Sequence, residues 1–349
     1  MRLLVLGTGR MATLQTERGW SHIDGVEIVA GCDIVPENLA AYCDAFGVPN
    51  RFSSLDEALA WGQFDAVTNV TPDAVHHPTT MALLAAGLPV FCEKPLATDY
   101  ALAMEMTEAA ERVGVVNMVN LTYRNVAELH TVRQLVTSGA IGEVKHIEAS
   151  YLQSWLALRS WIDPNIAGRW LWRMSTAHGS NGSLGDIGIH TLDLVTYGAA
   201  LDVKSLNCRL QTFNKVPGNR IGEYVLDAND SFIISAEFSN GAIGVIHASR
   251  WAGGHSNDQK LRIYGDKGGI ELNHGHWGTT LRVCLGDDLA TWTWRELTAE
   301  PVATNYHRFA AAVVAGRTDN DPDFRRAAAL QQVLDLALTA GADRREHQL

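Results

Sequence analysis

The chain contains 349 residues, of which 46% are hydrophobic and 19% charged, and it carries a formal net charge of −11. This length exceeds what one hydrophobic core ordinarily fills, so we expect two domains. The acidic balance argues against nucleic acid or an anionic membrane as a partner, because both are bound through clustered Lys and Arg. No stretch approaches the ~20 apolar residues of a membrane span, and the apolar run before the first glycine is too short for a signal peptide.

The five cysteines show no C-x-x-C spacing. We therefore expect a cytoplasmic protein with buried free thiols and no metal site.

The N-terminal segment has the order of a dinucleotide-binding unit. An apolar run at residues 2–6 leads into GTGRMA, a G-x-G-x-x-A pattern, and a second strand-like run at 26–32 ends in Asp33. Glycines let the backbone approach a pyrophosphate at a helix N-terminus, and the acid accepts hydrogen bonds from the adenine ribose. The expected cofactor-binding residues here are Gly7, Gly9, Arg10, Met11 and Asp33.

The same acid bears on which nicotinamide cofactor is bound. A carboxylate at Asp33 repels a 2′-phosphate, and the following Ile34, Val35 and Pro36 supply no positive charge to offset it. This favours NAD. Arg10, in the glycine loop, leaves NADP as the alternative.

Further βα units follow to about residue 122. Strand-like apolar runs alternate with helical stretches, and we expect strands at 65–70, 88–92 and 115–119 and helices at 36–46, 73–86 and 99–113. Right-handed crossovers then give a doubly wound parallel sheet with its ligand at the carboxyl ends of the strands. Two groups of polar residues follow such ends, and we add them to the cofactor site: Thr71, Pro72, His76, Glu93 and Lys94. Because Pro95 holds the preceding residue extended, Lys94 is expected to point into the crevice rather than to be a surface loop lysine.

From about residue 144 the pattern changes to strands joined by tight turns. The strand-like runs are 144–151, 205–213, 231–238, 242–249, 260–265 and 280–285, and Asn240-Gly241 is a hairpin signal. A helix is expected near 323–340. We assign residues 1–122 to a dinucleotide-binding domain and 123–349 to a substrate-binding and oligomerisation domain with an open, mainly antiparallel sheet. A large open sheet commonly covers one face with another subunit, so we expect a homodimer or homotetramer formed through it.

Tryptophans and arginines are interleaved between residues 155 and 173. Aromatic faces stack on sugar C–H faces, and arginines bind hydroxyls or carboxylates, so Arg169, Trp170 and Arg173 are candidate substrate-binding residues. The alternative is that the tryptophans serve packing or subunit contact.

The run SLGDIGIHTLDL at 183–194 places an acid and an imidazole, Asp186 and His190, four residues apart on an otherwise apolar helix face. One interpretation is structural: Ser183 and Asp186 fit a capping box, and His190 is a hydrogen-bonded core histidine. The other is catalytic, with the acid holding a substrate beside the base that deprotonates it.

These motifs together resemble the Gfo/Idh/MocA family, which includes glucose–fructose oxidoreductase and inositol dehydrogenase. The resemblance spans nearly the whole chain, including GAIGEVKHIEA at 139–149. The residues that carry it are Gly7-Thr-Gly9, Asp33, Thr71-Pro72 with His76, Glu93-Lys94-Pro95, Tyr123-Arg124 and Asp186-Ile-Gly-Ile-His190.

The resemblance implies roles for these positions. Lys94 would touch both the nicotinamide ribose and the reacting hydroxyl, His190 would be the general base, and Asp186 would bind and orient the substrate. The Lys94–Pro95 bond is often cis in such proteins. Tyr123 and Arg124 match a segment that lines the site. The chain departs from the family pattern at Gln15, where relatives often have histidine, and at Asn181-Gly-Ser183, where the approach to the aspartate is usually richer in glycine.

We therefore predict an NAD(P)-dependent oxidoreductase that transfers a hydride between a secondary hydroxyl of a sugar, sugar acid or cyclitol and the nicotinamide. The expected catalytic residues are Lys94, Asp186 and His190. Histidine accepts a proton near neutral pH, and an ammonium stabilises a developing alkoxide. Two alternatives are an NAD-dependent glycosidase that acts through transient oxidation and a non-catalytic dinucleotide-binding regulator.

Overall fold

The computed structural model describes residues 1–162 and 170–349, which form two compact units. Unit 1 contains Met1–Asn125 and Ala303–Gln331, and unit 2 contains Val126–Val302 and Gln332–Leu349. Sequence analysis assigned everything from 123 to 349 to the second domain. That assignment is wrong for 303–331, because this segment packs on the core of the first sheet.

Unit 1 is built on a six-stranded parallel sheet with the order β3-β2-β1-β4-β5-β6. Its strands are β1 (Arg2–Leu6), β2 (Glu27–Cys32), β3 (Asn50–Phe52), β4 (Ala66–Asn69), β5 (Val90–Cys92) and β6 (Asn117–Val119). The chain winds outward from β1 in both directions, which confirms the predicted doubly wound arrangement. The strand order reverses between β1 and β4, and a ligand crevice forms beyond the carboxyl ends of the strands at such a switch point.

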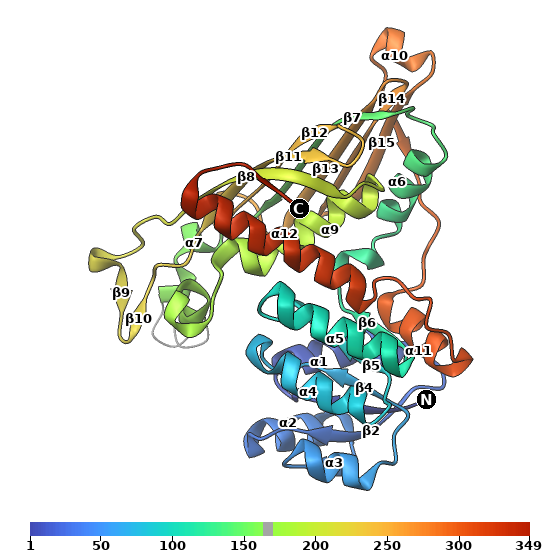
Figure 1. Cartoon of the computed structure of the whole chain (residues 1–349), viewed down its shortest axis with the longest axis vertical. Helices are drawn as coiled ribbons and strands as arrows, with labels where there is room; N and C mark the ends of the chain where they lie inside the picture. The colour runs from blue at the N-terminus through green and yellow to red at the C-terminus, as the bar shows by residue number, and fades with distance from the viewer. Residues whose placement is uncertain (163–169) are drawn as a thin grey trace. The chain divides into compact units, whose positions relative to one another are not determined.

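Helices alternate with these strands. They are α1 (Arg10–Arg18), η1 (Trp20–His22), α2 (Pro36–Phe46), α3 (Leu55–Trp61), α4 (Asp73–Ala85), α5 (Tyr100–Val113), η2 (Thr122–Asn125) and α11 (Asn305–Ala315). Several begin or end with local signals: Asp99 caps α5 by accepting from the Leu102 N–H, and Gly47, Gly62 and Gly114 end helices in the left-handed conformation. In Figure 1, α4 and α5 lie side by side along the sheet.

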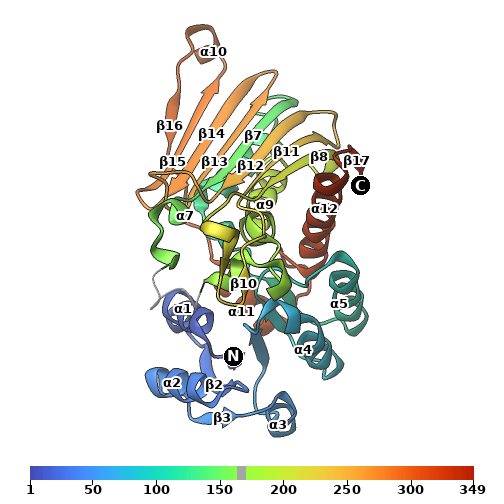
Figure 2. The ribbon, with the colours of Figure 1, turned by 90° about the vertical axis from the view of Figure 1, so that its left-hand side faces the viewer.

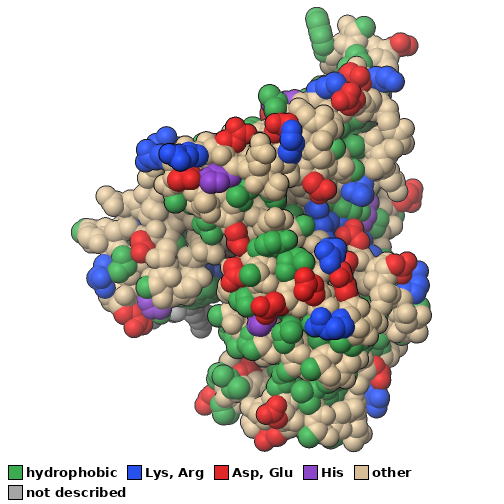
Figure 3. Space-filling view, viewed as in Figure 1, with side chains coloured by type: hydrophobic (Ala, Val, Ile, Leu, Met, Phe, Trp, Pro, Cys, Tyr) green, Lys and Arg blue, Asp and Glu red, His purple; other side chains and the backbone are tan. Residues whose placement is uncertain are grey.

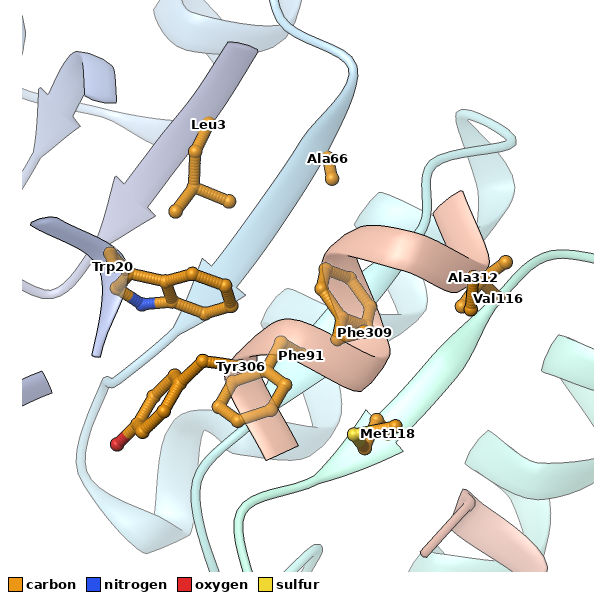
Figure 4. Packing of buried hydrophobic residues seen from close by; sticks show 9 residues of the cluster. All are labelled: Leu3, Trp20, Ala66, Phe91, Val116, Met118, Tyr306, Phe309 and Ala312. Atoms are coloured by element: carbon orange, nitrogen blue, oxygen red, sulfur yellow. The ribbon is translucent and has the colours of Figure 1, made fainter. Parts of the chain in front are cut away.

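One core of unit 1 is dominated by aromatic residues (Figure 4). The buried Trp20 ring meets Phe91 at 5.1 Å and Tyr306 at 4.9 Å between centroids, both edge-to-face, and Phe309 completes the cluster. Edge-to-face pairs add to the stabilisation that burial alone provides. Because Tyr306 and Phe309 lie on α11, the first sheet obtains part of its core from the end of the chain.

Unit 2 is built on a nine-stranded mixed sheet with the order β16-β15-β14-β13-β7-β12-β11-β8-β17. The strands are β7 (Val144–Leu152), β8 (Val203–Gln211), β11 (Ser231–Phe238), β12 (Ile243–Ser249), β13 (Asp258–Gly265), β14 (Gly268–Gly275), β15 (Gly278–Leu285), β16 (Arg295–Leu297) and β17 (His347–Gln348). Neighbours are antiparallel except β7 and β12, which pair in parallel. The expected mainly antiparallel sheet is thus confirmed. A separate two-stranded ribbon joins β9 (Arg220–Ile221) and β10 (Tyr224–Val225).

The helices of unit 2 include one that is buried on every side. They are α6 (Ala127–Thr137), α7 (Trp155–Leu158), η3 (Ser160–Ile162), η4 (Leu171–Met174), η5 (Thr176–His178), η6 (Leu184–Gly188), α9 (Ile189–Gly198), η7 (Pro217–Asn219) and α10 (Asp288–Thr291), and α12 (Phe324–Asp343) continues into unit 2 from unit 1. Figure 2 shows the strands side by side with α9 against one face of the sheet. Every residue of α9 is buried, including the polar His190, Thr191, Asp193 and Thr196. The two threonine hydroxyls donate to backbone carbonyls one turn earlier, which satisfies them inside the core.

Candidate functional site

The glycine loop of unit 1 has the shape that a dinucleotide requires. Gly7 has a φ of +83°, and a Cβ on it would lie 2.8 Å from the backbone of Val70 and Thr71, so only glycine fits. Gly9 precedes α1, and a Cβ there would meet nothing within 4 Å. The first-turn N–H groups of α1 receive no side-chain cap from Gly9. They are therefore available to an anion such as a pyrophosphate. Arg10 and Met11, the first two residues of α1, are both exposed.

Asp33 lies directly after β2 and is fixed next to this loop. Its Oδ2 accepts hydrogen bonds from the Thr8 N–H at 2.7 Å and from the Thr8 hydroxyl at 3.0 Å, and its Oδ1 accepts from the Val35 N–H at 2.8 Å. A carboxylate held in this way can still accept hydrogen bonds from ribose hydroxyls, because each oxygen has two lone pairs. The glycine loop, the α1 N-terminus and Asp33 therefore fit an NAD molecule.

His76 connects the loop after β4 to the loop after β5. The ring is fully buried, with Nδ1 at 2.7 Å from the Pro95 carbonyl oxygen and Nε2 at 2.7 Å from the Thr71 carbonyl oxygen. Carbonyl oxygens only accept, so both ring nitrogens must donate, and the imidazole is a cation. Burial opposes that charge, but Cys92, Asp73 and the Pro95 carbonyl outweigh it and raise the pKa of His76 to about 10. His76 therefore positions the loops after β4 and β5, and its predicted part in cofactor binding stays a prediction.

The Lys94–Pro95 peptide bond is cis, as the resemblance implied. The residue before it, Glu93, anchors this loop. Glu93 is buried, and its Oε1 accepts from Gln15 Nε2 and Asn120 Nδ2, both at 2.7 Å. Gln15, where the chain departs from the family pattern, is therefore a buried anchor of this loop. Lys94 itself is partly buried beyond the carboxyl end of β5. After β4, Thr71 is partly buried and Pro72 is exposed.

Tyr123 and Arg124 are neighbours on η2 but differ in how far they are buried. Tyr123 is partly buried, whereas Arg124 is 1% exposed and forms a 2.7 Å ion pair with Asp321. Arg124 thus attaches η2 to the returning segment of unit 1. These contacts give Arg124 a structural role. Its predicted contact with the substrate stays a prediction.

In unit 2, Asp186 and His190 are placed by a π-helical turn that leads into α9. Asp186 lies within η6, a π-helix, and His190 is the second residue of α9. Such turns are rare and occur often at functional sites. The capping-box interpretation is wrong, because Ser183 already has helical φ and ψ angles and makes no side-chain cap. Its hydroxyl donates to Asn229 Oδ1 instead.

The Asp186 carboxylate is oriented by a buried cation. Arg250, which follows β12 and is fully buried, donates from Nη2 to Asp186 Oδ2 at 2.7 Å. Arg173 Nε lies 3.9 Å from the same oxygen, and its guanidinium stacks over the rings of Trp170 and Trp172. Asp186 keeps 30% of its side chain exposed, so it remains able to accept hydrogen bonds from a ligand.

A chain of contacts runs from this cation to the neighbourhood of His190. Arg250 lies over the Trp155 ring at 4.9 Å, and Trp155 Nε1 donates to Gln153 Oε1 at 3.0 Å. Gln153 Nε2 and the Tyr151 hydroxyl both donate to Asn257 Oδ1, at 2.7 and 3.1 Å. The Tyr151 ring centroid lies 6.5 Å from that of His190. We call these linked side chains the support chain, because they connect the surroundings of Asp186 to those of His190.

A cavity of about 680 Å³ opens in unit 2 beside these residues. Its aromatic wall contains Trp155, Trp161 and Trp170, and Asp186 and Arg173 border it. Polar residues on its lining include Gln153, His255, Asn257 and His276. Arg169, a predicted substrate contact, lies outside the described residues.

Arg250 and the members of the support chain other than Trp155 were not predicted from the sequence. Strand pairing brings their residues together from β7, the end of β12 and the loop before β13, so no local pattern marks them. A charged residue directly after an apolar strand, as Arg250 is, was the one available signal. Within the described part of the chain, no group of three or more His, Cys, Asp or Glu side chains is placed to hold a metal ion.

Charged side chains of both signs lie on the surface. On the face drawn in Figure 3, acidic and basic side chains are interspersed. A continuous basic surface of the kind that nucleic acid needs does not form there.

Among the helices described, none has the length and apolar character needed to cross a bilayer. All five cysteines are buried and free, as predicted.

Comparison with known families now decides the classification. Residues 1–121 match the family model for an oxidoreductase with an NAD-binding Rossmann fold, and residues 129–271 match the C-terminal domain model of the same family. The chain belongs to the Gfo/Idh/MocA family. Unit 1 is its NAD-binding part, which agrees with the fit of the glycine loop and Asp33 and confirms the choice of cofactor.

Several named relatives act on sugars or polyols. Levoglucosan dehydrogenase of Pseudarthrobacter phenanthrenivorans is 28% identical over 68% of this chain and 63% of the relative's length. D-glucoside 3-dehydrogenase of Escherichia coli is 27% identical over 82% of this chain and 84% of its own. Inositol 2-dehydrogenase of an Arthrobacter strain is 25% identical over 80% of this chain and 78% of its own. Among solved structures, levoglucosan dehydrogenase in complex with NADH superposes with a TM-score of 0.85 at 23% identity, covering 100% of this chain and 98% of that one, and establishes a shared fold.

Proposed function

We propose that this member of the Gfo/Idh/MocA family is an NAD-dependent dehydrogenase that oxidises a secondary hydroxyl of a sugar, sugar acid or cyclitol. The proposal depends mainly on the environment of Asp186. This residue borders the cavity with part of its carboxylate exposed, and the buried Arg250 fixes the orientation of that carboxylate. His190 follows it on the adjoining helical turn. A fixed acceptor next to a potential base suits a substrate that presents neighbouring hydroxyls.

Each residue has a distinct task in the reaction. Bound NAD supplies the hydride acceptor. Asp186 accepts hydrogen bonds from substrate hydroxyls and orients the ring, and His190 accepts the proton of the reacting hydroxyl. Lys94, at the carboxyl end of β5, is assigned to stabilise the negative charge that develops on that oxygen. The proposal requires Lys94 and His190 to reach the same oxygen in the complex with substrate.

The names of the relatives support this choice of substrate class. Levoglucosan, D-glucosides and inositol are all cyclic and carry adjacent hydroxyls, and each is named as a substrate of a relative. Acceptors such as Asp186 recognise adjacent hydroxyls, whichever ring carries them.

The experiment is a panel of free sugars, glycosides, sugar acids and inositols incubated with NAD and followed by NADH absorbance. We expect turnover with at least one member, and a fall of at least about 100-fold in kcat for His190→Ala and Lys94→Met, given the size of general-base and electrostatic contributions. The exposed Lys145→Met variant is the control and should match wild type, because the ion pair that Lys145 forms with Glu143 lies on the surface. Absence of turnover with the whole panel, or a fully active His190→Ala variant, contradicts the proposal.

We also propose that the protein is a homodimer or homotetramer assembled through the large sheet. The support is the exposed face of its central strands, where Arg262 bridges Glu148 and Glu271 across three strands and Ile233 is 56% exposed. Light scattering coupled to size exclusion should give a multiple of the 38.0 kDa chain mass. A monomer mass at micromolar concentration contradicts this assignment.

A further inference from the structure

We propose that Asp230 is a positioning residue of the candidate site, which holds the guanidinium of Arg250 in the orientation in which that group binds Asp186. The inference rests on the proposed function, because Asp186 is assigned there to bind the substrate. It follows from four charges of alternating sign in unit 2, which we call the charge row: Lys215, Asp230, Arg250 and Asp186.

Strand pairing makes Asp230 and Arg250 cross-strand neighbours. They extend the pair of β11 and β12 by one step beyond Ser231 and Ser249, and the Arg250 N–H donates to the Asp230 carbonyl oxygen at 3.0 Å. Residues that are directly opposite in an antiparallel pair have their side chains on the same face, with Cβ atoms about 4.5–5.5 Å apart. The two charged side chains therefore lie side by side, and both are fully buried.

Lys215 fixes one oxygen of the Asp230 carboxylate. Asp230 Oδ2 lies 2.9 Å from Lys215 Nζ and accepts from the Phe213 N–H at 2.8 Å. The ammonium of Lys215 also donates to the carbonyl oxygens of Phe213 and Leu226, each at 3.2 Å, so three acceptors surround its three N–H groups. Because the carboxylate is held at Oδ2 from two sides, the direction of its other oxygen is fixed as well.

The second oxygen of Asp230 and one nitrogen of Arg250 are complementary. Asp230 Oδ1 and Arg250 Nε are both buried, and among the residues that the structure describes neither atom has a hydrogen-bond partner. A guanidinium N–H only donates and a carboxylate oxygen only accepts, so each atom attracts the other. Burial lowers the pKa of Arg250, and the charges of Asp186 and Asp230 oppose that shift. Two carboxylates therefore stabilise one buried cation.

The charge row divides two tasks between its carboxylates. Asp186 keeps 30% of its side chain exposed and can meet a ligand, whereas Asp230 is inaccessible to solvent. A buried cation needs compensation by charge, and a single partly exposed carboxylate would have to supply it while also binding substrate. Asp230 supplies the second negative charge from within the protein. The orientation of Arg250, and through it that of Asp186, then depends less on whether substrate is bound.

The kinetic test is a double-mutant cycle on kcat/KM, measured with NAD and the panel member that wild type oxidises fastest. Asp230→Asn keeps the size of the side chain and removes its charge. We expect it to lower kcat/KM by about 5- to 20-fold, with a higher KM and a lower kcat, as pairs in contact commonly show. In the Arg250→Met background the same substitution should change kcat/KM by less than about 2-fold, because Asp230 acts through the guanidinium. Equal losses in both backgrounds would contradict the inference.

A structural measurement provides a readout that does not require turnover. Crystal structures of wild type and Asp230→Asn, both with NADH bound, give the distance between Arg250 Nη2 and Asp186 Oδ2. We expect this distance to increase from 2.7 Å to more than about 3.5 Å, beyond the range of a hydrogen bond. An unchanged distance would contradict the inference, even if kcat/KM falls.

Two further variants separate positioning from folding. Phe238→Leu is the control, because Phe238 is fully buried at the other end of β11, roughly 26 Å along the strand from Asp230. It should lower the melting temperature and leave kcat/KM unchanged. Lys215→Met combined with Asp230→Asn removes both charges of the buried pair, so it should be more stable than Lys215→Met alone.

This double variant replaces Asp230→Asn in both measurements if the single variant does not fold. It should still lower kcat/KM by at least about 3-fold, because it lacks the charge that attracts Arg250. A wild-type kcat/KM in the double variant would show that Asp230 contributes to folding alone.

The outcomes separate this inference from the proposed function. If wild type oxidises a member of the panel but Asp230→Asn matches it in kcat/KM, the inference fails while the dehydrogenase stands. If wild type oxidises no member and the distance between Arg250 and Asp186 still increases in Asp230→Asn, the positioning of Arg250 holds and the proposed function fails. If wild type is inactive and the distance is unchanged, both fail.

Discussion

The guanidinium of Arg250 donates a 2.7 Å hydrogen bond to Asp186 from a position that is itself inaccessible to solvent. A buried guanidinium that binds a partly exposed carboxylate fixes the orientation of that carboxylate. The guanidinium itself loses its hydration in the process, which costs free energy. We expect Arg250→Met to lower kcat/KM by about 10- to 100-fold, because a hydrogen bond to a charged group contributes ~1.5–3 kcal/mol. Steady-state kinetics should show a rise in KM together with a fall in kcat, since Asp186 both binds and orients substrate.

A conservative variant and a surface control show whether the loss at Arg250 is specific. Arg250→Lys retains the charge without the planar fork and should keep part of the activity. Arg112→Met, on an exposed position of α5, should behave as wild type. Equal activity of Arg250→Met and Arg112→Met would show that Asp186 needs no fixed partner.

The glycine loop offers a matched pair of substitutions. Gly7→Ala places a Cβ 2.8 Å from the backbone of Val70 and Thr71 at a φ of +83°, so we expect a lower melting temperature. Gly9→Ala meets nothing within 4 Å and should keep the wild-type melting temperature. Its methyl group would nevertheless occupy the place where a pyrophosphate approaches α1, so NADH should bind at least about 10-fold more weakly. Unchanged NADH binding by Gly9→Ala, measured by fluorescence titration, would disprove the proposed location of the phosphates.

Stability should depend on pH through His76. Its pKa is raised from 6.5 to about 10 in the folded protein. The stability that its charge contributes is therefore fully present below pH 6.5, decreases as the pH rises, and is lost above about pH 10. Melting temperatures between pH 6 and 10.5 should fall more steeply for wild type than for His76→Leu, which lacks this group. Parallel curves for the two proteins would mean that His76 is neutral.

A buried ion pair in unit 2 should contribute strongly to folding. Lys215 Nζ lies 2.9 Å from Asp230 Oδ2, and both side chains are fully buried. Lys215→Met leaves an uncompensated buried carboxylate and should lower the free energy of unfolding by about 3–5 kcal/mol. Lys204→Met removes an exposed partner of Glu237 and should change it by less than about 1 kcal/mol. Urea denaturation distinguishes these values, and similar losses for both variants would contradict the expectation.

Most of the fold could be predicted because its strands carry strong local patterns. The central strands β1, after Arg2, and β5 are continuous apolar runs, as buried parallel strands are, and β4 begins as one with Ala66 and Val67. The prediction missed β3, an edge strand of only three residues, and β14, which begins with two glycines and alternates apolar with polar residues. No local sequence pattern predicts that the chain returns from unit 2 to unit 1. That return depends on which hydrophobic core the aromatic residues of α11 join, and an apolar helix could pack on either.

The candidate site was predictable where a motif carries the chemistry. Asp186 and His190 were identified from their spacing, and the structure adds a π-helical turn that no residue preference marks. His76 and Glu93 are predicted cofactor contacts because they follow strand ends, and the structure adds that both hold loops in place. Sequence position identifies which loops matter, whereas hydrogen-bond partners decide what each side chain does.

The contribution of α11 to the first sheet has a consequence for biosynthesis. Trp20 and Phe91 leave the ribosome long before Tyr306 and Phe309, which cover them in the finished protein. The nascent NAD-binding half therefore exposes an aromatic surface while every strand of the second sheet except β17 is being translated. A chain terminated before residue 303 would keep that surface uncovered, and we expect it to depend on chaperones or to aggregate, although every strand of its parallel sheet is present.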